Sequence, residues 1–182
     1  MTPAGWTRLG RTVLHENAFR RFLVDRVRIH SGDEIEYSWG DAAAAAFVVP
    51  LTDDGHVVLI RQYRYPVDRW IWEVPAGRIE GEASEETARR ELREEVGGVA
   101  REVLPLGSFF SAAAHLHLAC HVFLATGVVL ERTACREPTE LLEVRLLPAT
   151  EAFALVRQGG DVEAQSGLAL LMAEPVIGAR LP

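Results

Sequence analysis

The stretch EVPAGRIEGEASEETARRELREEVGG, residues 73–98, decides how the rest of the chain is interpreted. In its second half, Ala88, Leu92 and Val96 recur every four residues, a spacing typical of a helix face that packs on a sheet. Ser84 is expected to cap the start of this helix, and a pair of glycines to end it. The stretch therefore predicts a glycine-containing turn followed by one amphipathic helix.

Acidic residues crowd this helix, with seven carboxylates among the sixteen residues 80–95. Glu91 and Glu95 are four residues apart, so their side chains are neighbours on the helix surface. Like charges at that spacing destabilise a helix by roughly 0.2–0.5 kcal/mol. A divalent cation between the two carboxylates would remove the repulsion, because carboxylate oxygens are preferred ligands of Mg²⁺.

The same residues also fit a helix that is merely solvated. Glu85 and Arg89 have the spacing of an ordinary surface ion pair, as do Arg90 and Glu94. From the helix alone, both interpretations remain open.

Length and composition are those of a globular protein. The chain has 182 residues, 48% of them hydrophobic and 25% charged, which fits one domain. The net charge of −7 argues against a sequence-independent nucleic-acid binder, which needs a basic face. Cys120 and Cys135 form no metal-binding spacing, and their scarcity favours a reducing compartment. The longest apolar run, 42–50, is far short of the ~20 residues that span a bilayer. A cytoplasmic protein without nucleic-acid or membrane partners is expected.

The first 40 residues predict a small β-rich N-terminal layer, followed by the main domain at 41–182 in the same compact unit. Alternating apolar residues indicate strands at 6–13, 19–29 and 35–39. The aromatic residues here suit either a contact with another copy of the chain or stacking on a ligand.

Strands and helices alternate in the remaining sequence, which predicts an α/β fold. The expected strands are 42–50, 56–61, 71–74, 100–106, 119–126 and 141–147, and the expected later helices are 151–157 and 164–173. His115, His117 and His121 fall around one predicted strand. A metal site, a half-exposed strand face and a phosphate-contacting or acid/base role all remain open for them.

The register of the acids matches a known pattern. Glu82 is followed by seven residues and then by RELREEVG at 90–97. This resembles the signature of the Nudix hydrolases, G-x5-E-x7-R-E-U-x-E-E-x-G-U, in which U is apolar. Two departures occur: the turn from Gly77 to Glu82 is one residue shorter, and Gly98 occupies the last apolar position. Neither changes the acids on the helix.

The resemblance extends over roughly residues 6–173. The run RQYRYPVDRWIWEVPAG at 61–77 is similar to the ADP-ribose pyrophosphatase branch, and so is the tail at 139–173. The segment 110–115 departs most, because related enzymes often have Ser-Pro-Gly where this chain has alanines. The resemblance implies a Nudix α/β/α sandwich with a mixed sheet, to which the small N-terminal β layer is added.

The resemblance also implies roles for individual residues. The implied metal ligands are Ala76 (through its carbonyl), Glu82, Glu91, Glu94, Glu95 and Glu140. The implied proton acceptors are Glu94, Glu137 and Glu140. The implied substrate-binding residues are Arg64, Glu73, Trp6 and Phe19, the last two stacking on adenine across a dimer. Arg90 is expected to join the turn to the helix.

The function implied is Mg²⁺-dependent hydrolysis of a nucleoside diphosphate linked to another group, with ADP-ribose cleaved to AMP and ribose 5-phosphate as the first choice. Mn²⁺ or another divalent cation can substitute for Mg²⁺, and a homodimer is implied. The rival substrates are another nucleotide sugar, a dinucleotide such as NADH or FAD, or a damaged nucleotide. A non-catalytic nucleotide sensor is the rival from another class.

Overall fold

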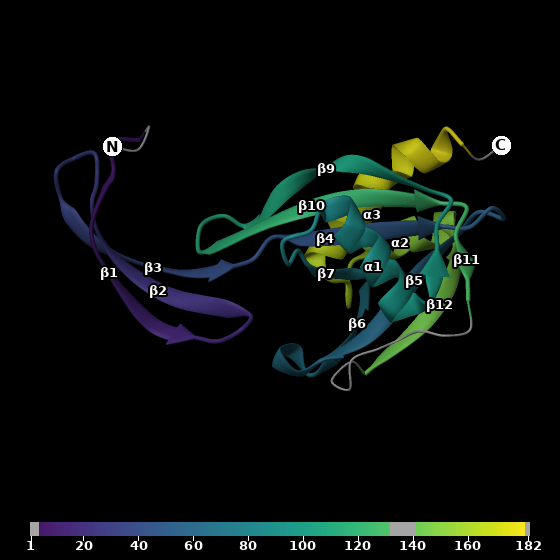
Figure 1. Cartoon of the computed structure of the whole chain (residues 1–182), viewed down its shortest axis with the longest axis horizontal. Helices are drawn as coiled ribbons and strands as arrows, with labels where there is room; N and C mark the ends of the chain where they lie inside the picture. The colour runs from purple at the N-terminus through teal and green to yellow at the C-terminus, as the bar shows by residue number, and fades with distance from the viewer. Residues whose placement is uncertain (1–3, 132–140, 181–182) are drawn as a thin grey trace. The chain divides into compact units, whose positions relative to one another are not determined.

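The computed structural model describes residues 4–131 and 141–180. Two units are compact by their internal contacts: residues 1–44 with 110–119, and residues 45–109 with 120–182. Figure 1 shows the course of the chain. We call these unit 1 and unit 2 and describe each by itself.

Unit 1 is a three-stranded antiparallel sheet together with the tip of a later hairpin. Its strands are β1 (Thr7–Glu16), β2 (Arg20–Arg28) and β3 (Glu34–Ala42). This confirms the three strands predicted from alternation. The tip joins β9 (Glu102–Ala112) to β10 (Leu116–Thr126), whose first residues pair in parallel with the end of β3.

Unit 2 is built on a mixed sheet in the order β10, β4 (Ala45–Leu51), β5 (His56–Arg64) and β12 (Leu142–Pro148). Strand β10 runs parallel to β4, whereas β5 and β12 are antiparallel to each other. The shorter strands of this unit are β6 (Arg69–Glu73), β7 (Ala76–Arg78), β8 (Gly98–Val99) and β11 (Val129–Leu130). A 3₁₀ turn, η1, covers Tyr65–Val67.

Helices cover both faces of this sheet. Helix α1 (Ser84–Val96) packs Ala88, Leu92 and Val96 against one face, with Ile60 of β5 in the same cluster. Helices α2 (Ala149–Gln158) and α3 (Ala164–Gly178) lie behind the sheet in Figure 1 and pack against each other. Unit 2 is therefore the expected α/β/α sandwich.

Three predicted boundaries were wrong, each for a local reason. The residue that caps α1 is Ala83, not Ser84, and the Glu86 carboxylate accepts its backbone N–H at 3.4 Å. Strands β9 and β10 continue almost through the predicted gap, because the two strands pair as one long hairpin. Helix α3 extends past 173 and includes Pro175 in its last turn, where the proline has no N–H to donate to the Leu171 carbonyl.

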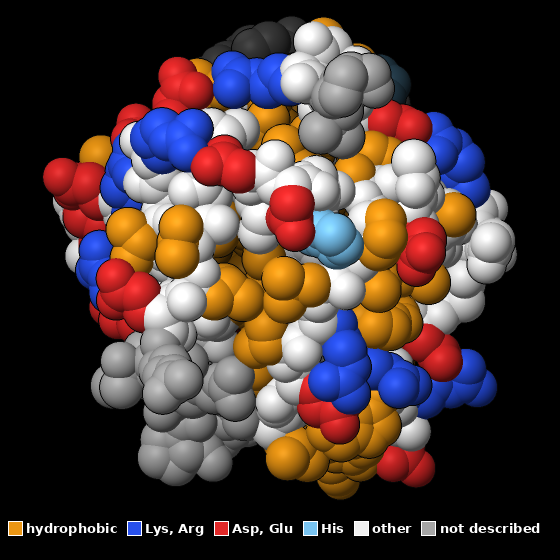
Figure 2. Space-filling model, turned by 90° about the vertical axis from the view of Figure 1, so that its right-hand side faces the viewer, with side chains coloured by type: hydrophobic (Ala, Val, Ile, Leu, Met, Phe, Trp, Pro, Cys, Tyr) orange, Lys and Arg blue, Asp and Glu red, His pale blue; other side chains and the backbone are white. Residues whose placement is uncertain are grey.

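The surface of unit 2 carries both signs of charge. On the face drawn in Figure 2, acidic and basic side chains are interspersed among hydrophobic ones. Among the helices that the structure describes, none is both long and apolar enough to cross a membrane.

Leu92 tests the packing of α1, since its side chain is 1% exposed in the cluster between helix and sheet. Leu92→Ala should lower the free energy of unfolding by about 2–5 kcal/mol, because it removes buried methyl groups and leaves a cavity. Chemical denaturation measures the change. Leu168→Ala is the matched control, because Leu168 is 40% exposed on α3 and should lose far less. Equal losses in the two variants would contradict this packing.

Candidate active site

Glu91 and Glu95 lie buried between α1 and the backbone of β7. Only 8% of Glu91 and 5% of Glu95 is exposed. The Ala76 N–H donates a hydrogen bond to Glu95 Oε2 at 3.0 Å. A Cβ built on Gly77 would lie 1.8 Å from Glu91 Oε1, so that carboxylate rests directly on the Gly77 backbone. Two ionisable groups at this depth require compensating charge or hydrogen bonds.

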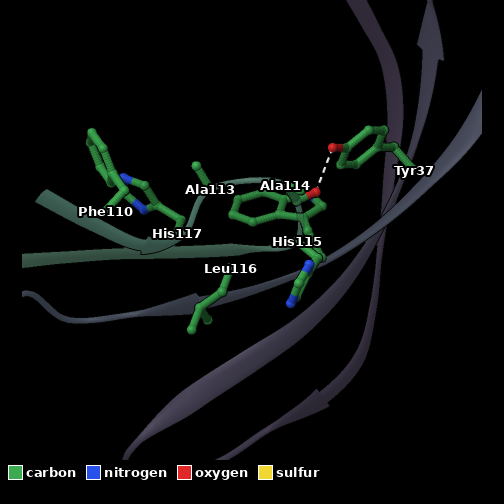
Figure 3. A pocket seen from close by; sticks show the side chains of 8 residues that line it. Tyr37, Phe110, Ala113, Ala114, His115, Leu116 and His117 are labelled. Carbon is green, nitrogen blue, oxygen red and sulfur yellow. Dashed lines mark hydrogen bonds between the residues drawn. The ribbon is translucent and has the colours of Figure 1, made fainter. Parts of the chain in front are cut away.

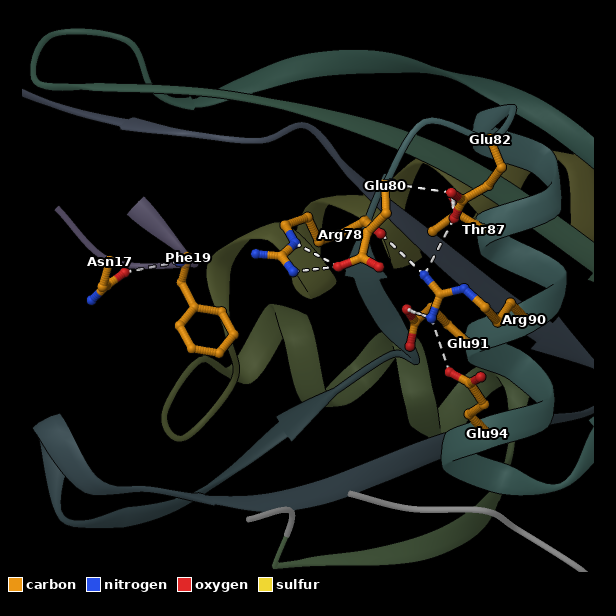
Figure 4. Close-up of polar contacts among 9 residues, drawn as sticks. All are labelled: Asn17, Phe19, Arg78, Glu80, Glu82, Thr87, Arg90, Glu91 and Glu94. Carbon is orange, nitrogen blue, oxygen red and sulfur yellow. Dashed lines mark hydrogen bonds and ion pairs between the residues drawn. The ribbon is translucent and has the colours of Figure 1, made fainter. Parts of the chain in front are cut away.

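Arg90 fixes the turn to the helix (Figure 4). Its Nη2 donates to the Arg78 carbonyl at 3.1 Å, which confirms its expected linking role. Its Nη1 lies 2.7 Å from Glu91 Oε1 and 2.9 Å from Glu94 Oε2. Arg90 thus neutralises part of the acidic charge and orients Glu94, which is one of the predicted proton acceptors.

Glu82 is engaged within the turn. It accepts hydrogen bonds from the Thr87 hydroxyl at 2.7 Å and from the Glu80 N–H at 3.1 Å. The Thr87 bond, followed by those from backbone N–H groups, lowers the pKa of Glu82 to about 2. Glu82 therefore stays charged at neutral pH, and its expected place near a metal remains a prediction.

The donor set suits a hard cation. Carboxylate oxygens from Glu91 and Glu95, with the backbone at Ala76 beside them, are the type of ligand that Mg²⁺ takes together with water and substrate oxygens. No cluster of three or more His, Cys, Asp or Glu side chains that could hold a metal occurs in the described parts of the chain.

Arg64 and Glu73 form a fork-shaped pair in the same unit. Arg64 Nε and Nη2 donate to the two Glu73 oxygens at 2.6 and 2.5 Å. The Glu73 side chain is 5% exposed, whereas that of Arg64 is 47% exposed. The Glu73 hydrogen bonds raise the pKa of Arg64, and the charge of Glu95 adds to this. Both Glu73 oxygens are therefore occupied by Arg64, and the half-exposed Arg64 guanidinium keeps N–H groups that can face solvent.

Sequence reasoning missed Glu163, which lies near this pair. Its side chain caps α3 by accepting the Ser166 N–H at 2.7 Å. Burial raises the pKa of Glu163, and Glu73 contributes to the shift. The run Asp161-Val162-Glu163 immediately before a predicted helix was the available signal for such a cap.

The two predicted stacking residues lie far apart in unit 1. Trp6 precedes β1 and packs edge-on against Tyr37, with 6.2 Å between ring centroids. Phe19 lies in the turn after β1, where its N–H donates to Asn17 Oδ1 (Figure 4), and it is 65% exposed. The ten residues of β1 separate them by about 33 Å, so one chain cannot stack both on one ring.

Unit 1 instead has an aromatic pocket of about 320 Å³ beside the hairpin tip (Figure 3). Its lining residues are Tyr37, Trp39, Phe110, Ala113, Ala114, His115, Leu116 and His117.

Three of these rings each have one polar atom engaged by a neighbour in unit 1. The Tyr37 hydroxyl donates to the Ala114 carbonyl, Trp39 Nε1 donates to Asp25, and His117 Nδ1 lies 2.9 Å from Asp41. The pocket therefore presents mainly ring faces, with the exposed His115 and His117 in its wall. Of the alternatives open for the histidines, the half-exposed strand face fits His117, which is exposed on β10, whereas His115 is exposed in the turn before that strand.

Two predicted proton acceptors, Glu137 and Glu140, lie outside the described residues. Their roles stay predictions from the resemblance.

Comparisons with known proteins agree with this geometry. Residues 41–166 match the model of the NUDIX domain. An ADP-ribose pyrophosphatase of Bacillus subtilis is 30% identical over 166 residues, 88% of this chain and 90% of that protein. A Streptomyces rubellomurinus protein, CMP-5'-(N-acetyl-N-hydroxy-3-aminopropyl)phosphonate hydrolase, is 31% identical over 96% of this chain and 85% of its own length.

The fold agrees as well. The solved structure of an ADP compounds hydrolase superposes with a TM-score of 0.83, covering 96% of this chain and 95% of that one at 23% identity. With the acidic helix packed on the glycine turn and the family model spanning most of the chain, this protein belongs to the Nudix family and is a Nudix hydrolase similar to the ADP-ribose pyrophosphatases.

Proposed function

We propose that the protein hydrolyses the diphosphate of ADP-ribose, giving AMP and ribose 5-phosphate, with Mg²⁺ as its divalent cation. The observation that carries the proposal is the buried pair Glu91 and Glu95 against the Ala76–Gly77 backbone. In a diphosphate hydrolase, bound Mg²⁺ offsets the charge of the phosphate oxygens and acidifies a bound water. Glu91, Glu95 and the Ala76 carbonyl would hold it.

The remaining groups of the chain bind and orient the substrate. Arg64 would donate its free N–H groups to a phosphate, since guanidinium matches phosphate geometry. Glu73 would act by positioning Arg64 rather than by touching the substrate. One of three acids would accept the proton of the attacking water: Glu94, whose Oε2 lies 2.9 Å from Arg90 Nη1, or Glu137, or Glu140.

A second candidate substrate deserves a place in the test. The Streptomyces relative is named for a CMP-linked phosphonate, and its identity to this chain equals that of the ADP-ribose pyrophosphatase within one percentage point. A CMP-linked compound, ADP-glucose, NADH and FAD therefore belong in the panel. Retention of Glu91, Glu94 and Glu95 argues against a non-catalytic sensor.

The substrate panel with Mg²⁺ should give AMP and ribose 5-phosphate from ADP-ribose, separated by chromatography. Glu95→Gln should lower kcat by roughly 100-fold or more, because a ligand charge is lost while the hydrogen bond to the Ala76 N–H can persist. Glu85→Gln is the control, since Glu85 forms an ion pair with Arg89 at 3.0 Å on the exposed face of α1 and the variant should leave kcat near wild type. Normal turnover by Glu95→Gln would contradict the metal assignment.

The Arg64–Glu73 pair predicts a shared effect on KM. Arg64→Lys removes the fork geometry, and Glu73→Gln removes the charge that holds Arg64, so each should raise KM about 10-fold with a smaller change in kcat. Steady-state kinetics with ADP-ribose measures both constants. Arg69→Lys is the control, because Arg69 lies opposite Arg64 on β6 but pairs with the exposed Asp161. A KM for Glu73→Gln equal to wild type would remove the positioning role.

We further propose a homodimer formed through unit 1. Leu14 and Phe19 are each 65% exposed there, and Trp6 and Phe19 can approach one ring only if two chains supply them. The aromatic pocket around Trp39 offers a further surface for the adenine base.

Sedimentation velocity should show a species of twice 20.1 kDa. The double variant Leu14→Asp with Phe19→Asp should sediment as a monomer, because it places charge in an apolar contact. Val129→Asp, at a residue that is 64% exposed in unit 2, should remain dimeric. A monomeric wild type would remove the stacking role of Trp6 across the dimer.

A further inference from the structure

Gln62 is a buried amide on the same face of β5 as Arg64. Side chains two residues apart in a strand point to one face, so Ile60, Gln62 and Arg64 form a row. Ile60 belongs to the core under α1, and Arg64 is held by Glu73. Across the ladders, Gln62 faces Leu142 of β12 and Ile71 of β6. Gln62 thus lies between the apolar core at Ile60 and the predicted phosphate-binding residue Arg64.

The amide lacks what a buried polar group normally has. Gln62 is 6% exposed, and its Oε1 is fully buried without a hydrogen-bond partner in the part of the chain that the structure describes. Nearly all buried polar side-chain atoms in proteins have a partner, because an unpaired one loses its hydration without compensation. The neighbours Ile60, Ile71 and Leu142 would pack equally well against Met or Leu. Packing therefore does not account for an amide here.

A ligand on Arg64 would extend toward this amide. The Cα atoms of residues two apart in a strand are separated by about 7 Å, which is the scale from a phosphate to the adjoining sugar. Phosphate oxygens of a diphosphate only accept hydrogen bonds, so they cannot satisfy Oε1. A sugar hydroxyl can donate to it. The last torsion of Gln is broad, so the amide can turn Oε1 toward such a group.

We propose that Gln62 is a specificity-determining residue whose Oε1 accepts a hydrogen bond from a pentose hydroxyl of the substrate. This rests on the proposed hydrolysis of a nucleoside diphosphate linked to ribose. A site built to bond a hydroxyl discriminates strongly against analogues without it, because its polar group is then left unpaired. The stability of the free protein is lowered by the same unpaired atom that selects the substrate.

Gln62→Met tests this, since Met keeps a similar unbranched shape and removes the acceptor. Its Tm should equal or exceed that of wild type, whereas kcat/KM for ADP-ribose should fall about 10- to 100-fold. Gln62→Leu is a second deletion of the amide. Gln158→Met, the same change at an exposed position on α2, is the control and should alter neither quantity.

ADP-ribose analogues that lack one pentose hydroxyl at a time identify the partner. For one of them, wild type and Gln62→Met should have equal kcat/KM, because the bond is already missing. The proposal is overturned if wild type and Gln62→Met have equal kcat/KM for ADP-ribose itself. It is also overturned if Gln62→Met shows the same loss of kcat/KM with every analogue as with ADP-ribose. A lowered Tm with unchanged kcat/KM would assign Gln62 to the core instead. If the wild type does not cleave ADP-ribose, the proposed function fails. That result comes from the wild type alone and is therefore distinct from any result with the Gln62 variants.

Discussion

The close approach of two buried carboxylates to the backbone of β7 is the constraint on which the site depends. Glu91 Oε1 occupies the space that a side chain at position 77 would need, and Glu95 accepts the neighbouring Ala76 N–H at 3.0 Å. Only glycine allows this contact without displacing the carboxylate. Ala76 and Gly77 belong to β7, which pairs with β4 in the centre of the sheet. The helix is therefore positioned both by its apolar face and by its acids.

Charge is distributed so that basic groups orient the acids. Arg90 contacts Glu91 and Glu94 and also the carbonyl before the helix, and Arg64 is bound by Glu73 while it feels the charge of Glu95. Each guanidinium ties one element to another. Such preorganised charges need little rearrangement when an anionic ligand arrives, which is what electrostatic stabilisation of a reaction requires.

Much of the fold was predictable because its signals are local. Ala88, Leu92 and Val96 predicted the buried face of α1, and the alternating residues of the first 40 predicted three strands. The cap at Ala83 was not predictable from residue type, since alanine has no polar side chain and the bond comes from Glu86. The length of the β9–β10 hairpin was missed because Gly107 and the alanines at 112–114, residue types that are rare in strands, suggested a break between the two strands.

For the candidate site too, some features were visible in the sequence and others depend on how the strands pair. The register of Glu82, Arg90, Glu91 and Glu95 was visible in the sequence, and so was the linking role of Arg90. The commitment of Glu73 to Arg64 was not, because it depends on which residues of β5 and β6 face one another. The aromatic pocket was missed for a similar reason: Trp39 and Phe110 are distant in sequence and meet only through the hairpin tip.

That hairpin tip has a consequence for how the protein can be divided. Residues 110–119 are inserted between two segments of unit 2, yet they group with the N-terminal strands, and the His115 carbonyl accepts the Gly40 N–H at 2.8 Å. The N-terminal layer is therefore no detachable module. A truncated protein that begins after residue 44 would lack β3, the strand that pairs with the hairpin tip. Phe110 and Leu116 would lose Trp39 and Tyr37 as neighbours, and the exposed strand edge and apolar side chains would favour aggregation.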